Sequence, residues 1–273
     1  MRVPYAIHFA ELDALYESAG RDPARRLARM EQHRATVLLR DDATARFVTL
    51  KVQQGQYDDA IDLMTGREFE VWEGGRLNVA GDWVNAYLLR GCRHMTARRS
   101  RAALADFEAA QNLPDNLPSE RGSGVRRTAI HYWLGTAHAA LGDLGKARDD
   151  WERATSTETS GPSRRRRGTR VSPGHYYRAL ALQKLGQTDE ARTQFESLIE
   201  EGKRQLESPM KAAGSLSVSE QLSLRTRRAD AYCLIGLGHM GLGQKDRADE
   251  ALHNALEARP DHLLAIMVRE NPL

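Results

Sequence analysis

The side chains with the most reactive chemistry in this chain are its histidines and its two cysteines. His131 and His138 are seven residues apart on one predicted helix, but the HExxH pattern that holds zinc is missing and no carboxylate follows at a useful helical spacing. Cys92 and Cys233 fall inside predicted helices, where a buried, unreactive thiol is expected. We therefore expect no metal site, no cofactor and no enzymatic activity.

Glycine-rich motifs give the same result. The sequence contains neither the G-x-x-x-x-G-K-[ST] loop that cradles phosphates nor the G-x-S-x-G turn that presents a nucleophile. The segment GLGHMGLG at 236–243 looks like a dinucleotide-binding loop. It lies within a predicted helix of an internal repeat, where its glycines are expected to serve packing and helix termination.

That repeat is the main organising signal in the chain. From Gly135, a glycine follows at +7 (Gly142), alanines at +12 and +19, and the large side chain of Trp151 at +16. Four other positions start the same pattern, the first of them weakly: Val48, Gly91, Ala179 and Gly236. Self-similarity at a fixed spacing predicts a repeat architecture.

Each copy is predicted to be a helical hairpin. The small residue that starts the pattern lets the first helix approach the second closely, and the glycine at +7 suits the left-handed conformation at a helix end. Arg98 stands where the copy that starts at Gly91 should have this glycine. Near the N-terminus, Asp22 as N-cap and Pro23 at the first helical position predict one more, degenerate hairpin.

These offsets resemble the tetratricopeptide repeat (TPR) over roughly residues 42 to 260. The resemblance implies an all-α, right-handed superhelix of about five to six helical hairpins, whose concave wall is made by the first helices and binds a protein or peptide. The copies step by 43, 44, 44 and 57 residues, more than the family's repeat of about 34. We therefore expect one solenoid domain over 1–273 with irregular insertions at 66–78, 156–173 and 208–222.

A second resemblance is to long bacterial proteins in which a β-rich, sugar-mutarotase-like region precedes a TPR array. It is carried by ELDALYE at 11–17, DPARRL at 22–27 and TGREFEVWEGG at 65–75. This resemblance implies that the chain is a stand-alone version of the helical end of such a protein, or a piece of it, and that a mutarotase-like β-rich domain is a candidate partner. Because the β-rich part is absent from the sequence, its chemistry does not transfer.

Candidate partner-binding residues come from two regions. On the expected concave wall they are Asn85, Leu88, Tyr132, Thr136, Tyr176 and Gln183. In the first insertion, Trp72 and Glu73 are candidates for contact with a partner domain, and packing of Trp72 on the core is the alternative. For each wall residue, packing between repeats is an equally good interpretation.

A third candidate is the segment at 155–174, which is rich in Ser, Thr and Gly and carries a cluster of arginines: Arg164, Arg165, Arg166, Arg167 and Arg170. Such a cluster could hold phosphate or an acidic protein surface, and an exposed insertion without function is the alternative. No aromatic residue lies between the arginines, which argues against base stacking and makes nucleic acid the less favoured partner.

Composition sets the remaining limits. The 273 residues are 41% hydrophobic and carry 40 basic against 37 acidic side chains, so the net charge is only +3. No run approaches the roughly 18 apolar residues of a membrane helix, no secretory signal is recognisable, and two cysteines suit a reducing compartment. We expect a cytoplasmic interaction scaffold. Two alternatives remain: the helical accessory half of a carbohydrate-metabolism protein, and a regulatory or nucleic-acid binder that uses the arginine cluster.

Overall fold

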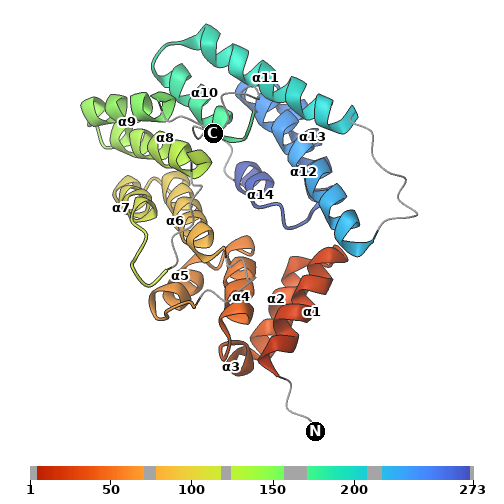
Figure 1. Cartoon of the computed structure of the whole chain (residues 1–273). Helices are drawn as coiled ribbons and strands as arrows, with labels where there is room; N and C mark the ends of the chain where they lie inside the picture. Colours follow the sequence, from red (N-terminus) through yellow and green to blue (C-terminus); the bar gives the residue numbers. More distant parts are fainter. Residues whose placement is uncertain (1–4, 71–77, 118–123, 157–170, 208–216, 271–273) are drawn as a thin grey trace.

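Helices account for all the regular secondary structure that the computed structural model describes, which covers residues 5–70, 78–117, 124–156, 171–207 and 217–270 (Figure 1). The fourteen helices within these ranges are α1 (Ala6–Ser18), α2 (Pro23–Gln32), α3 (Arg34–Val37), α4 (Asp41–Gln53), α5 (Tyr57–Thr65), α6 (Val79–Thr96), α7 (Ser100–Gln111), α8 (Gly124–Ala140), α9 (Leu144–Ser156), α10 (Gly174–Lys184), α11 (Thr188–Glu207), α12 (Val218–Gly241), α13 (Lys245–Ala258) and α14 (Leu263–Glu270). The all-α prediction is confirmed over these residues.

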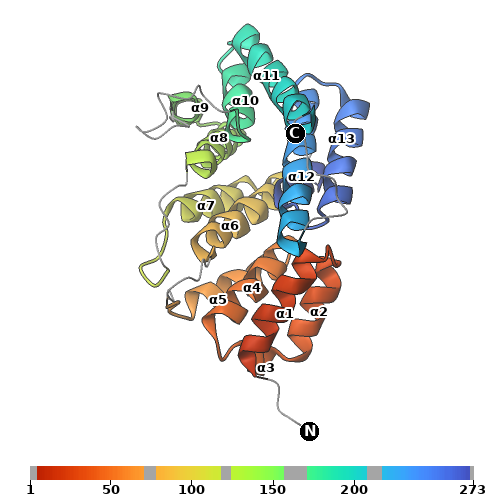
Figure 2. The same cartoon turned by 45° about the vertical axis from the view of Figure 1, so that its right-hand side comes forward.

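Consecutive helices pair into six hairpins that follow one another along an arc. The pairs are α1/α2, α4/α5, α6/α7, α8/α9, α10/α11 and α12/α13. The first helices α4, α6, α8 and α10 lie on the inner side of the arc, and α5, α7, α9 and α11 lie on its outer side (Figure 1). The arc turns back on itself, so that the start of α12 lies beside the end of α1 in both views (Figures 1 and 2).

The turns inside the hairpins have the backbone conformation that the repeat predicts. Gly55, Gly142, Gly186 and Gly243 have φ angles of +73°, +86°, +81° and +71°. Arg98, which occupies the same place in the remaining copy, also has a positive φ, of +58°. A residue with a Cβ rarely adopts this region. The turn therefore has the same backbone conformation in this copy, although its residue is an arginine.

The small residues on the first helices make room for the large side chains of the second. A Cβ added to Gly91 would lie 2.4 Å from the ring of Phe107. A Cβ added to Gly135 would lie 2.6 Å from the Trp151 indole and 2.9 Å from the carbonyl oxygen of Ala147. Real Cβ atoms essentially never come this close to other heavy atoms, so glycine sets the distance between the two helices of these hairpins.

Helix capping explains where the predicted boundaries hold and where one fails. Asp22 accepts a hydrogen bond of 3.0 Å from the amide of Ala24 and caps α2, as predicted. The expected irregular stretch 208–222 is too long, because α12 begins at Val218. Ser217 and Glu220 form a capping box at that point, with the Ser217 amide donating to Glu220 over 2.9 Å.

Among the helices within the described ranges, none combines the length and the apolar character that crossing a membrane would require.

Candidate partner-binding surface

The predicted wall residues divide into a buried group and a group that reaches the surface. The buried side chains are Leu88, Tyr132 and Tyr176, with exposed fractions of 4%, 2% and 1%. Asn85 and Thr136 are half-buried and Gln183 is exposed. For the buried three, the structure therefore supports packing between hairpins, the alternative that the sequence left open, and a partner could reach only the other group directly.

The buried tyrosines make aromatic contacts both between neighbouring hairpins and within one hairpin. Tyr132 on α8 lies 5.9 Å from Tyr177 on α10, and Tyr176 lies 6.0 Å from Phe195 on α11, measured between ring centroids. Burial raises the pKa of Tyr132 to about 12. The Tyr132 phenol therefore stays protonated near neutral pH and serves packing rather than acid–base chemistry.

Two residues of the surface group, Thr136 and Gln183, are held in place by hydrogen bonds. Thr136 donates to the carbonyl oxygen of Tyr132 one turn earlier over 2.9 Å. The Gln183 amide donates across to the carbonyl oxygen of Gly241 at the end of α12 over 3.4 Å. These contacts tie the surface positions of α8 and α10 to the framework that carries them.

Both cysteines lie in the core. Cys92 and Cys233 are free thiols, each with an exposed fraction of 1%. Burial raises the pKa of the Cys92 thiol well above its ordinary value, and a protonated thiol is a poor nucleophile. The prediction of buried thiols is confirmed.

An acidic partner for the histidines escaped the sequence analysis. Asp150, on α9, lies 2.9 Å from Nδ1 of His138 and 3.8 Å from Nδ1 of His131. Burial acts to raise the pKa of Asp150, but the two neighbouring histidines outweigh this effect and lower it. Asp106 faces His94 at the same offsets in the preceding hairpin, at 3.7 Å, so comparison of the copies would have found the pair. Within the described part of the chain, no three such side chains group as metal ligands.

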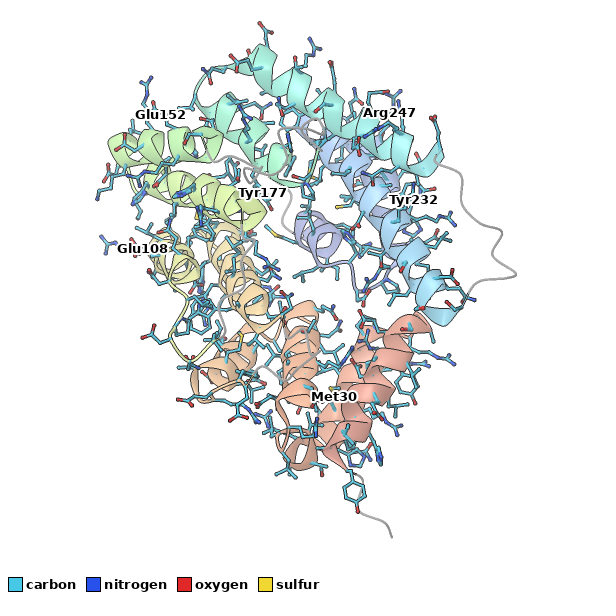
Figure 3. All side chains as sticks on the ribbon, in the orientation of Figure 1. Met30, Glu108, Glu152, Tyr177, Tyr232 and Arg247 are labelled. Atoms are coloured by element: carbon cyan, nitrogen blue, oxygen red, sulfur yellow. The ribbon has the colours of Figure 1, made fainter. Side chains whose placement is uncertain are left out.

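The chain's own last helix lies inside the arc. Ala265, Met267 and Val268 of α14 are buried in the main core cluster, and the Tyr177 hydroxyl donates to the Met267 sulfur over 3.6 Å. Figure 3 shows Tyr177 on the inner side, and it shows Glu108 and Glu152 on the outer helices α7 and α9. A partner on this wall would therefore meet α14 as well as the first helices. The repeat pattern in the sequence did not predict this helix.

An ion network joins the two ends of the arc. Arg26 donates to both carboxylate oxygens of Asp13, over 2.8 and 2.9 Å, and to Asp261 over 3.3 Å. Arg259 bridges Glu17 at 3.0 Å and Asp261 at 2.8 Å. Burial acts to raise the pKa of Asp261, but the hydrogen bond and charge of Arg259, with the charge of Arg26, lower it. The first hairpin and the α13–α14 turn are thus held together by buried charges.

A cavity of about 540 Å³ lies beside this network, between α1 and α4. Its polar lining includes Glu11, Glu17, Asp42, Arg46 and Thr49. Arg46 already pairs with Asp13 at 3.0 Å and with Glu17 at 3.1 Å. Arg46 therefore neutralises part of the acidic lining of this cavity.

Two predicted site regions lie outside the described residues. They contain Trp72, Glu73, Arg164, Arg165, Arg166, Arg167 and Arg170. The described start of the first insertion is anchored, because Arg67 donates to Asp41 over 2.6 Å and Phe69 is buried. The TGREF part of this segment thus has a fixed position against the start of α4.

Stacked helical hairpins with small-residue contacts define an α-solenoid. Three segments of the chain match the tetratricopeptide repeat family, at residues 88–161, 175–201 and 229–262. The chain therefore carries tetratricopeptide repeats in these three segments, within an all-α, TPR-like superhelix. A solved structure to which it is similar is that of YrrB, described as a TPR protein with an unusual peptide-binding site. That match has 17% sequence identity and a TM-score of 0.30, and it covers 89% of this chain and 96% of that one.

Proposed function

We propose that this protein is a non-catalytic scaffold that binds a protein or peptide partner along the inner wall of its arc. The observation that carries the proposal is the regular placement of the first helices α4, α6, α8 and α10 on the inner side. Solenoids bind partners on the surface that such a repeated placement creates. The TPR matches support the same class of function.

In this proposal the surface residues Asn85, Thr136 and Gln183 contact the partner. The buried Tyr132 and Tyr176 act indirectly, because they hold α8 and α10 at the spacing that places the surface residues. Trp72 and Glu73, which lie outside the described residues, are proposed as further contacts.

The test is affinity capture from the native extract, followed by mass spectrometry, with wall and outer-face variants compared side by side. The wall variant carries Asn85→Arg and Gln183→Arg. The control carries Glu108→Arg and Glu152→Arg on the outer helices, where both glutamates are exposed (Figure 3). A partner retained by the control and lost from the wall variant is the expected result. Equal retention by both variants, or turnover of a small substrate by the purified chain, would overturn the proposal.

A second candidate function is an accessory role beside a mutarotase-like β-rich protein. The anchoring of Arg67 on Asp41 favours it, because it fixes the start of the TGREFEVWEGG segment that carries this resemblance. If a β-rich protein of this kind is encoded beside the gene, co-expression should yield a complex that deletion of 71–77 weakens. If the complex forms equally well without residues 71–77, this segment is not where the β-rich protein binds.

A further inference from the structure

A cavity of about 410 Å³ opens between the α4–α5 turn and the α6–α7 turn, and none of the residues of the ion network lines it. Three arginines contribute to its lining, which consists of Gly55, Tyr57, Asp58, Arg90, Arg93, His94, Ala97 and Arg99. A concave site with this many guanidinium groups is suited to an anion.

Arg93 is held in a fixed position at this cavity. Its guanidinium carbon lies 4.4 Å from the centroid of the Tyr57 ring, and its Nη1 donates to the carbonyl oxygen of Gly55 over 2.9 Å. A Cβ on Gly55 would lie 2.3 Å from Nη2 of Arg93, so a larger residue there would displace the guanidinium from this position. The stack and the single hydrogen bond leave further N–H groups of Arg93 free to donate.

The other two arginines differ in how far their charge is neutralised. Arg90 donates to Asp106 through Nε and Nη2 and to Asp58 through Nη1, so its donors are largely used. Arg99 is exposed, and it makes no side-chain hydrogen bond or ion pair with any residue that the structure describes. Arg98 and Arg101 beside it are exposed as well, which leaves an excess of positive charge around this cavity.

A second cavity, of about 450 Å³, shares Gly55 and Arg93 with the first and reaches α13 and α14. Arg269 and His253 line the second cavity, and Glu257 lies 3.5 Å from Nε2 of His253. The space is therefore larger than a single small anion needs, and it can hold the group that carries the anion.

We propose that the cavity lined by Arg93 and Arg99 binds a phosphate group. Arg93 approaches it from α6 and Arg99 from the start of α7. Donors that converge from separate elements suit the tetrahedral oxygens of phosphate better than the planar pair of a carboxylate, which one arginine fork satisfies. The phosphate belongs either to a free phosphate compound or to a phosphorylated side chain of a partner, and the binding test separates these sources.

The test is isothermal titration of the whole chain at low ionic strength with pyrophosphate, with a phosphoserine peptide, with the same peptide unphosphorylated, and with succinate. We expect at least one phosphate probe to bind and the unphosphorylated peptide not to bind. Tighter binding of pyrophosphate identifies a free phosphate compound as the source, and tighter binding of the phosphopeptide identifies a modified partner.

Arg93→Gln and Arg99→Gln should each weaken binding about 10-fold or more, because each removes a charge-assisted hydrogen bond. Arg192→Gln is the matched control, since Arg192 is an exposed helix arginine at the far side of the repeat array. Arg99 is exposed and contributes no packing, so its variant tests the site even if the Arg93 variant folds poorly. Binding of no phosphate probe, binding of succinate as tight as that of phosphate, or equal affinity in the Arg99 variant and the control would overturn the proposal.

Discussion

Replacing Arg98 by glycine should make the protein more stable, although it removes a whole side chain. Arg98 is the non-glycine residue with positive φ in the described part of the chain, at +58°. This conformation costs a residue with a Cβ about 1–2 kcal/mol, whereas glycine costs about 0.5–1 kcal/mol through the greater freedom of the unfolded chain. The Arg98 side chain is exposed, so little packing is lost. The difference is a gain of about 0.5–1 kcal/mol for Arg98→Gly.

Urea denaturation followed by circular dichroism measures this gain, and a thermal melt should show a rise of about 1–4 °C. Arg99→Gly is the matched control, because Arg99 has a φ of −98° and gains nothing from glycine. Gly186→Ala supplies the reverse case. Its φ is +81° and no atom lies within 4 Å of an added Cβ, so it should lose about 1 kcal/mol through backbone strain alone. If Arg98→Gly lowers the free energy of unfolding as much as Arg99→Gly does, backbone strain at Arg98 does not limit the stability of the protein.

Three further outcomes are expected from the same denaturation assay. Gly135→Ala should lower the free energy of unfolding by about 1–3 kcal/mol, because its Cβ would meet Trp151. Gly145→Ala is the control: no atom lies closer than 3.8 Å to its added Cβ, so it should be neutral or slightly stabilising. Equal effects of the two substitutions would contradict the packing argument. Arg26→Met should lower the free energy of unfolding by about 3 kcal/mol, since it leaves the buried carboxylates of Asp13 and Asp261 with fewer partners. A loss below about 1 kcal/mol would show that the ion network does not hold the two ends of the arc together. The pKa of Asp261 is lowered in the folded state, so its contribution to stability is complete above its unfolded pKa of about 3.9 and is lost as the pH falls through the lower, folded value. Asp261→Asn should flatten this acid dependence, and an unchanged pH profile in that variant would contradict the assignment.

The sequence predicted the hairpins because their determinants are local and repeated. Gly135 and Trp151 are 16 residues apart and meet within one hairpin, so the same offset recurs wherever the same contact is made. Arg98 has a positive φ although the other copies have glycine at this position, so the position within the repeat predicts the turn better than the type of residue found there. Local spacing was therefore sufficient for the class of fold.

The candidate surface was harder to predict, because it depends on what neighbouring hairpins cover. Helical periodicity places Tyr132 and Tyr176 on the first helices, but it cannot tell whether the next hairpin buries them. The contact that closes the arc has no periodic signal in the sequence. Arg26 and Asp261 are 235 positions apart, and this pair is not repeated in the other copies. Helix α14 was missed because it is a single short element with no counterpart in the other copies.

The contact between the first hairpin and the α13–α14 turn changes how such an array should come apart. In an open stack each unit touches only its neighbours, so the outermost units fray first and melting spreads inward. Here the outermost units brace each other through Arg26, Asp261 and Arg259. The array is therefore closed rather than open. We expect unfolding to begin at the least stable interface between neighbouring hairpins, wherever it lies, and not at the two terminal units.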